Sequence, residues 1–264
     1  MKHIIYFYSG TGNSLAVAKE LENTGAEVHS ISFEYQIMQE KQENLIICKA
    51  RKIGFVIPTY YLGLPRIVHE FIKALDIKNA DYIYVVATMG GNIKGGIIRQ
   101  MKALIKEKNC TLDMGCYVQM PMNDFTFAKV DEPDRQKMLL EKSEKRIKDV
   151  VKIVQNEKKH FDFEPIGFMT KKRNAPFCEN VKTCDSKFSV TEECTGCDIC
   201  SEMCSSANIK MIDKRPQWQH GCQMCLACFH NCPEQAILYD GKGKGIPHYH
   251  HPNYSLAEKV KYTK

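Results

Sequence analysis

The chain has 264 residues with 13 cysteines and one tryptophan, and 37 basic against 31 acidic residues give it a formal net charge of +6. Its length favours two domains over one. A content of 44% hydrophobic and 26% charged residues is ordinary for a soluble globular protein and excludes a disordered or collagen-like chain. Since no apolar run reaches about 18 residues and the N-terminus lacks the features of a secretory signal, we expect a cytoplasmic protein without a membrane span.

The part of the chain before about residue 160 predicts alternating strands and helices. We expect strands at 3–8, 27–32, 52–57, 81–88 and 113–120, and helices at 13–23, 65–75, 94–108 and 133–159. Asp131 is the expected cap of the last helix. This alternation predicts a parallel sheet covered on both faces, with ligands bound beyond the carboxyl ends of the strands, near the point where the strand order reverses.

The loop after the first expected strand has the composition of a phosphate site. Its two glycines allow a ligand to approach the backbone, and hydroxyls at positions 9, 11 and 14 lie at a helix N-terminus. A plain strand-to-helix turn capped by Asn13 or Ser14 is the alternative. The string YFYSGTGNS resembles the phosphate loop of flavodoxins, and it departs from the dinucleotide pattern because Leu15 occupies the third glycine position. The resemblance implies that an FMN phosphate is held within Ser9, Gly10, Thr11, Gly12, Asn13 and Ser14.

Two further loops follow the third and fourth expected strands, where flavodoxin-like folds contact the isoalloxazine ring. The first offers tyrosines that can stack on a flat ring, and the second offers glycines whose backbone amides can meet its polar edge. Half-buried tyrosines and an ordinary turn are the alternatives. The expected FMN contacts are Pro58, Thr59, Tyr60, Tyr61, Leu62 and Gly63 in the first loop, and Thr88, Met89, Gly90, Gly91 and Asn92 in the second. We expect the connection 121–132 to cover the flavin, to dock a second domain, or to be a surface loop.

Ten of the 13 cysteines lie between Cys178 and Cys232. Because cytosolic thiols stay reduced, such crowding indicates metal binding before disulfides. Eight of the cysteines repeat the spacing C-x2-C-x2-C-x3-C, which is the run of bacterial two-cluster ferredoxins, in which the fourth cysteine serves the other cluster. Zinc would leave four of the eight unused. The prediction is two 4Fe–4S clusters with crossed ligand sets: Cys194, Cys197, Cys200 and Cys232 for the first, and Cys222, Cys225, Cys228 and Cys204 for the second.

Some residues depart from these motifs. Ser205 stands where the first run usually has proline, and we expect altered packing or potential there rather than loss of a cluster. Cys178 and Cys184 fit no ligand spacing, and are either buried or free thiols or part of an extra metal site. We expect the histidine-rich segment GIPHYHHP near the C-terminus to be a structural strand or a clasp between domains, with metal binding as the alternative.

Nearly the whole chain resembles an anaerobe family that fuses a short flavodoxin-like domain to a two-cluster ferredoxin. The resemblance implies an α/β fold with a flavodoxin-like doubly wound parallel sheet, followed by an α+β domain like a bacterial dicluster ferredoxin. We place the FMN domain at 1–160, a connector at 161–179, the cluster domain at 180–245 and a basic, histidine-rich tail at 246–264.

Iron–sulfur clusters move single electrons and a flavin stores two, so the combination predicts a soluble, low-potential electron-transfer protein with redox proteins as partners, such as ferredoxin-dependent oxidoreductases. The alternative is a ferredoxin-fed, FMN-dependent reductase of a small organic substrate of the quinone, nitro or enone type. We expect a monomer or homodimer, and no nucleic-acid partner because the basic residues are dispersed. The positive charge is expected to offset the negative charge that the clusters and the phosphate bring.

Overall fold

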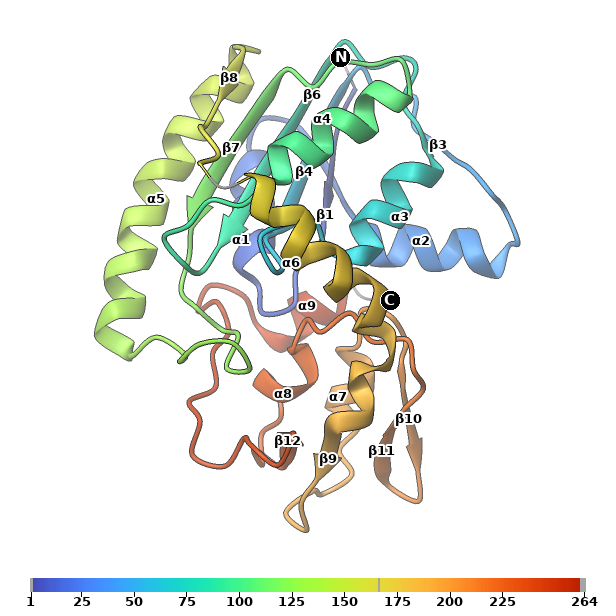
Figure 1. Cartoon of the computed structure of the whole chain (residues 1–264), viewed down its shortest axis with the longest axis vertical. Coiled ribbons are helices and arrows are strands. Elements are labelled where there is room, and N and C mark those ends of the chain that lie inside the picture. Colours follow the sequence, from blue (N-terminus) through green and yellow to red (C-terminus); the bar gives the residue numbers. More distant parts are fainter. Residues whose placement is uncertain (1, 166, 262–264) are drawn as a thin grey trace.

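A computed structural model describes residues 2–165 and 167–261 (Figure 1). Within these residues the largest sheet is parallel and six-stranded, in the order β2-β1-β4-β6-β7-β8. Apart from the short edge strand β8, this is the 2-1-3-4-5 order of flavodoxin-like doubly wound folds, so the strand order reverses between β1 and β4. The strands are β1 (His3–Phe7), β2 (Glu27–Ser30), β4 (Lys52–Pro58), β6 (Tyr82–Met89), β7 (Met114–Gln119) and β8 (His160–Phe161).

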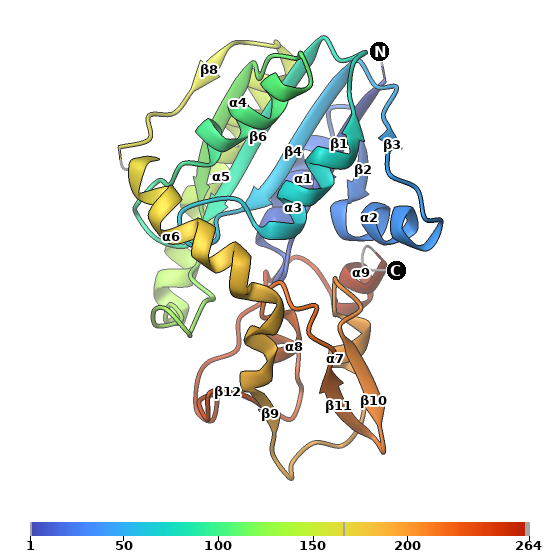
Figure 2. The same cartoon turned by 45° about the vertical axis from the view of Figure 1, so that its right-hand side comes forward.

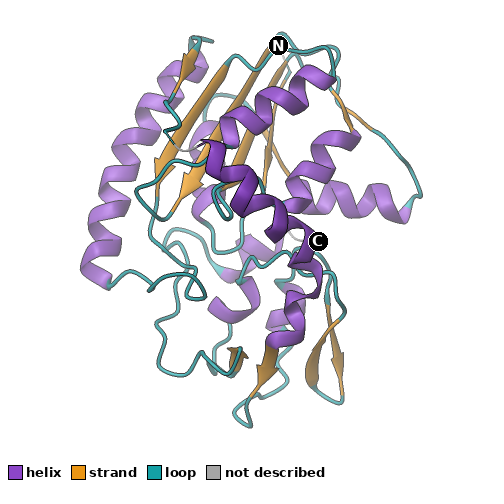
Figure 3. Cartoon of the chain, in the orientation of Figure 1, coloured by secondary structure: helices purple, strands orange, loops and turns teal. Residues whose placement is uncertain are grey.

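Helices cover both faces of this sheet, as Figure 3 shows. Successive side chains of β1 point to opposite faces: Ile5 and Phe7 pack with α1 and α5, whereas Ile4 and Tyr6 pack with α3 and α4. The predicted parallel sheet with two buried faces is therefore confirmed. The helices are α1 (Asn13–Glu22), α2 (Ile31–Glu40), α3 (Arg66–Ala74), α4 (Ile97–Glu107) and α5 (Pro133–Gln155), and the short strands β3 (Ile46–Ile47) and β5 (Leu75–Asp76) pair with each other.

Helix α2 is an element that the sequence pattern does not predict. The expected second strand stops at Ser30, whose hydroxyl accepts a hydrogen bond from the Phe33 amide at 3.4 Å. This side-chain cap starts a helix where the apolar pattern alone favours a longer strand.

The predicted cap of α5 is wrong. Glu132 is the residue that precedes the helix, and its side chain makes no capping bond. Asp131 instead accepts a hydrogen bond from the Met122 amide at 2.8 Å and pairs with Arg135 at 2.7 Å, so it fixes the connection before the helix. The helix also ends at Gln155, before the expected end at 159, and the chain continues into β8.

The cysteine-rich part forms a smaller unit at the carboxyl edge of the sheet (Figure 2). Its strands form two antiparallel pairs, β9 with β12 and β10 with β11. A hydrophobic core of its own includes Val181, Phe188, Phe229 and Ile237. The elements are the 3-10 helix η1 (Val181–Lys187), β9 (Phe188–Val190), α7 (Ile199–Glu202), β10 (Ile209–Ile212), β11 (Arg215–Trp218), α8 (Ala227–His230) and β12 (Ile237–Tyr239).

The two cysteine runs of this unit adopt the same local conformation. Asp198 and Leu226 each follow the second cysteine of a run, have φ values of 66° and 59°, and start α7 and α8. In both runs the sulfur of the fourth cysteine accepts the amide N–H of the residue four positions later, at 3.2 Å for Cys204 and 3.3 Å for Cys232. The unit is therefore an internal repeat in structure as well as in sequence.

The region expected to be a connector is mostly a helix, α6 (Gly167–Asn180), which runs from the sheet to the cysteine unit (Figure 1). After β12 the chain returns toward the sheet, and its last described element is α9 (Leu256–Lys261). Among the described residues, none of the helices combines the length and the apolar character needed to cross a bilayer.

Candidate functional site

A cavity of about 410 Å³ lies where β4 and β6 end, between the sheet and the cysteine unit. Its walls come from the loops after these strands, from the connection 121–132, from α6 and from the second cysteine run. Its volume falls in the range of about 300–1,000 Å³ that is usual for sites of drug-sized ligands. Of the loop residues predicted to contact FMN, those that line it are Thr59, Tyr60, Tyr61, Leu62, Met89, Gly90, Gly91 and Asn92, whereas Pro58, Gly63 and Thr88 lie beside the lining residues in the chain.

The loop after β4 supplies an aromatic wall. Tyr61 stacks on Phe177 of α6, with ring centroids 4.4 Å apart and planes at 17°, and Phe127 meets Tyr61 edge-on at 5.9 Å. Tyr61 and Leu62 have φ values of 47° and 69°, a left-handed conformation that costs energy for residues with side chains and is often found at functional sites. The Tyr61 ring, which was predicted to stack on a flat ligand, therefore already stacks on Phe177 with one of its faces.

Thr59 carries an unsatisfied polar atom in the same wall. Its Oγ1 is buried and has no hydrogen-bond partner among the residues described. An unpaired buried hydroxyl costs about 1–3 kcal/mol. Because almost none of this oxygen is accessible to solvent, it does not face the cavity.

Helix α6 fixes the strained loop through two buried polar residues one turn apart. Thr170 Oγ1 donates to the carbonyl of Leu62 at 3.0 Å. Asn174 Nδ2 donates to the carbonyls of Tyr60 and Leu64, at 2.9 and 3.0 Å. Because residues four apart share a helix face, this face holds the loop in place.

A neighbouring face of α6 closes the cavity. Met169, Arg173 and Phe177, again four residues apart, line it. These residues were not predicted as part of the site, because the segment was expected to be a connector. The sequence did carry a signal for this helix. Thr170 and Asn174 are polar residues at helical spacing, and the residues that line the cavity repeat at the same spacing.

The connection 121–132 joins the cavity to the cysteine unit. Phe127 lines the cavity, and Phe125 packs on Phe229 of α8 with ring centroids 4.1 Å apart. Asn123 also lines the cavity, and its Nδ2 donates to Thr11 Oγ1 at 2.6 Å. The connection therefore contacts both parts of the chain, as one of the expectations had it, and it also forms a wall of the cavity; that it covers a flavin stays a prediction.

The predicted phosphate loop lies next to the cavity but does not line it. Thr11, Gly12 and Ser14 are buried, and Ser14 Oγ hydrogen-bonds Thr88 Oγ1 at 2.8 Å. Gly12 is left-handed, with a φ of 98°, and donates its N–H to Ser9 Oγ at 3.1 Å. It precedes α1, which has no side-chain cap, so the first amides of this helix point toward the loop in the manner of an anion site.

The histidine-rich segment near the C-terminus lies over this loop. The His251 amide donates to the Thr11 carbonyl at 2.8 Å, and the Tyr249 hydroxyl donates to Asn13 Oδ1 at 2.6 Å. The Tyr249 amide also donates to Nδ1 of His230 in α8, at 3.1 Å. The segment therefore contacts both the sheet domain and the cysteine unit.

The cysteines of the first predicted set lie together. Cys194, Cys197, Cys200 and Cys232 line one small cavity at the outer end of the cysteine unit. Burial, and secondarily the neighbouring thiols Cys197, Cys232 and Cys194, raise the pKa of Cys200 to about 12. Among the described residues, no group of three or more histidine, cysteine or acidic side chains has the geometry to hold a single metal ion.

The second predicted set is brought together in the same crossed manner. Burial raises the pKa of Cys225 to about 12, and the thiols of Cys204 and Cys222 act in the same direction. Burial likewise raises the pKa of Cys228, and the neighbouring thiols of Cys225, Cys222 and Cys204 raise it further. Cys204, from the first run, therefore neighbours the second run. Such buried thiols ionise only when a cation such as iron compensates the charge.

Cys225 belongs to both sites. It lines the 410 Å³ cavity, and it is a member of the second cysteine set. Gly10 of the predicted phosphate loop packs directly on its peptide, because a Cβ atom built on Gly10 would lie 2.2 Å from the Cys225 carbonyl oxygen. The two predicted cofactor sites therefore adjoin at one residue.

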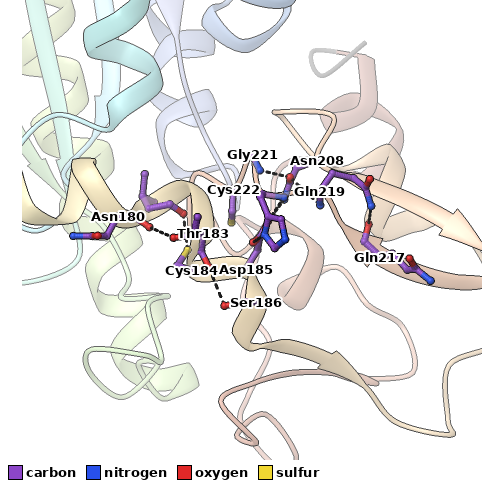
Figure 4. A network of polar contacts seen from close by, with 12 residues as sticks. Asn180, Thr183, Cys184, Asp185, Ser186, Asn208, Gln217, Gln219, Gly221 and Cys222 are labelled. Carbon is purple, nitrogen blue, oxygen red and sulfur yellow. Dashed lines mark hydrogen bonds and ion pairs between the residues drawn. The ribbon is translucent and has the colours of Figure 1, made fainter.

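A buried polar network supports the second set from behind (Figure 4). The carboxylate of Asp185 accepts hydrogen bonds from Asn208 Nδ2 at 2.8 Å and from the His220 amide at 2.9 Å. Cys184, in the same 3-10 helix, donates to the Val181 carbonyl at 2.8 Å and lies 3.6 Å from the Met224 sulfur. This extra thiol is therefore half-buried beside the second run.

Comparisons with known proteins give no family. No family model and no curated protein matches the chain. Among solved structures, a "putative flavoprotein" from Bacteroides uniformis has 15% identity and a TM-score of 0.34, over 45% of this chain and 89% of its own. Rubredoxin oxygen:oxidoreductase from the anaerobe Desulfovibrio gigas has 15% identity and a TM-score of 0.33, over 59% of this chain and 36% of its own. RosB with bound 8-demethyl-8-formylriboflavin-5'-phosphate has 12% identity and a TM-score of 0.37, over 70% of this chain and 85% of its own. Similarities this low identify neither a family nor an activity.

Proposed function

We propose that this chain is a flavin- and iron–sulfur-dependent electron-transfer protein, with FMN in the large cavity and a 4Fe–4S cluster in each crossed cysteine set. The observation that carries the proposal is the position of Cys225, which is both a member of the second set and part of the cavity wall. Clusters exchange single electrons and a flavin stores two, so a shared wall suits transfer between them.

The cavity and the loop beside it offer two features that suit a flavin. The aromatic wall of the cavity at Tyr61 and Phe177 suits a flat ring. Beside the cavity, and joined to it by Asn123, the loop at Thr11 carries the N-terminus of α1. A phosphate would be held there if the contacts of Tyr249 and His251 with this loop made room for it.

The cysteine sets fit clusters by their donor chemistry. Each set gathers four thiols, and thiolates are the ligands of 4Fe–4S clusters. The sulfurs of Cys204 and Cys232 already accept backbone N–H groups, which is how proteins stabilise the charge of such sites. The polar support at Asp185 holds the backbone of the second set in position.

The proposed partners are small redox proteins in the cytoplasm, a compartment that keeps thiols reduced. Nucleic acid is not a proposed partner, and the proposal is neutral between a monomer and a homodimer.

Anaerobic purification of the full chain tests the proposal. We expect about eight iron, about eight sulfide and about one FMN per chain, since each 4Fe–4S cluster contributes four iron and four sulfide. Reduction with dithionite should bleach both the flavin and the cluster absorbance. Preparations that bind flavin but no iron, or iron but no flavin after reconstitution with both, contradict the proposal.

A reductase of small organic molecules is the second candidate. The observation that favours it is the exposed apolar side chains at the cavity: Phe127 is 65% exposed and Ile93 is 57% exposed. Unburied apolar groups at a cavity mouth suit a substrate that packs on the flavin. Repeated turnover of quinones, nitroaromatics or enones with reduced ferredoxin would establish this activity, whereas a single stoichiometric oxidation would exclude it.

A further inference from the structure

Ser205 occupies an unusual position between the two predicted cofactor sites. It replaces the proline that usually follows the fourth cysteine of such a run, and it is only 3% exposed. Its Oγ donates to the hydroxyl of Tyr8 at 3.4 Å and lies 3.9 Å from the sulfur of Cys225. The replacement therefore brings a hydroxyl group near the sulfur of Cys225, a residue that lines the cavity.

Tyr8 connects this hydroxyl to the cavity wall. It follows β1, is 1% exposed and is the residue before the predicted phosphate loop. Its ring meets that of Tyr60, which lines the cavity, edge-on at 6.2 Å. Ser205, Tyr8 and Tyr60 thus form a continuous contact from Cys225 to the cavity.

The first cysteine set has no counterpart to this hydroxyl. The repeat places Pro233 where Ser205 stands in the other half, and Pro233 lines the cavity of Cys197. Cys197 is exposed, whereas Ser205 and its surroundings are buried. The two halves of the repeat therefore differ in hydrogen bonding at the equivalent point.

We propose that Ser205 donates a hydrogen bond to the Cys225 sulfur and so makes the second cluster the higher-potential centre, next to the flavin. This rests on the proposed function. A thiolate only accepts, so the Ser205 hydroxyl turns to it and Tyr8 donates to Ser205 in turn. Reduction adds negative charge to a cluster, and a donor on its sulfur stabilises the reduced form more than the oxidised one.

This difference in potential between the two clusters sets the direction of electron transfer. The first cluster, with the exposed Cys197, lies at the outer end of the unit and accepts electrons from a partner protein. The second cluster, held at Ser205 and Cys225, passes them to the cavity. A rise in potential from the outer to the inner cluster favours this order.

Anaerobic redox titration of the full chain, followed by absorbance and electron paramagnetic resonance, tests the role of Ser205. We expect Ser205→Ala to lower the potential of one of the two cluster steps by about 59 mV, which is a tenfold change in a one-electron equilibrium. Ser205→Thr, which keeps the hydroxyl, should restore the original potential. Ser189→Ala, on the exposed side of β9, is the matched control and should change neither step.

The reciprocal variant Pro233→Ser tests the assignment. It introduces a hydroxyl near the first set and should raise the other step. If Ser205→Ala moves the potentials no more than Ser189→Ala does, or if it moves the same step as Pro233→Ser, the proposal is wrong. Ser205→Pro, the residue usual in this run, provides the same test if the alanine variant loses iron. A wild-type protein without iron refutes the proposed function itself, whereas a loaded one without the shift refutes only this inference.

Discussion

Replacement of Gly10 by alanine tests how closely the loop after β1 packs on the cysteine unit. The φ angle of Gly10 is not among the left-handed ones, so alanine is excluded only by contact. Its Cβ would lie 2.2 Å from the carbonyl oxygen and 3.1 Å from the Cβ of Cys225, and both are held by the fold. The loop and Cys225 must separate by roughly 1 Å, and overpacking of this kind costs about 1–3 kcal/mol of unfolding free energy.

Urea denaturation of anaerobic protein, followed by circular dichroism, measures this cost. Gly91→Ala is the control, because a Cβ at Gly91 would meet only the Ile93 amide nitrogen at 4.0 Å, and we expect a change within about 0.5 kcal/mol. Iron analysis of Gly10→Ala should show a larger loss from the second set than from the first. If Gly10→Ala matches the wild type in both stability and iron content, the packing between the two parts is not as described.

Further predictions concern pH, α6 and the extra thiol. Burial, with Lys52 as a smaller cause, lowers the pKa of His3 from 6.5 to about 4, so this buried histidine contributes stability above pH 6.5 that is lost as pH falls toward 4. The loss is at most about 3 kcal/mol, and His3→Gln should flatten the dependence of the urea midpoint on pH over this range. Asn174→Ala should destabilise the chain by about 2 kcal/mol or more, because two carbonyls of the loop after β4 lose their donor. The same variant should bind FMN more weakly in a fluorescence titration. Unchanged FMN affinity would contradict this role of α6. Cys184→Ser should leave about eight iron per chain, since each proposed cluster already has four cysteine ligands, and a loss of about four would make Cys184 a ligand.

The sequence predicted the frame of the sheet and the position of the loops. Apolar runs such as Asp81–Thr88 are visible because a strand buried on both faces needs consecutive apolar residues. Helix α2 was not predicted because its start depends on a single hydroxyl, that of Ser30, which caps a helix where the strand pattern would otherwise continue. The predicted cap at Asp131 was wrong because that carboxylate finds a stronger set of partners in Met122 and Arg135.

The cavity could be predicted only in part. The wall formed by Tyr60 and Tyr61 could be predicted because these residues come directly after β4, whereas the wall formed by α6 could not. The segment that became α6 carries Pro176 and three consecutive basic residues, which favour a linker. It becomes a helix because Thr170 and Asn174 find carbonyl acceptors on a loop more than 100 positions earlier in the chain.

The sequence by itself predicts the ligand chemistry that we propose, because the cysteine spacing and the phosphate-like loop are local patterns that can be recognised without reference to distant residues. The tertiary structure decided how these sites meet. Ser205 lies 197 positions from Tyr8, and Cys225 lies still farther from Gly10 along the chain. Contacts of this kind depend on the packing of every element in between, so they leave no periodic signal in the sequence.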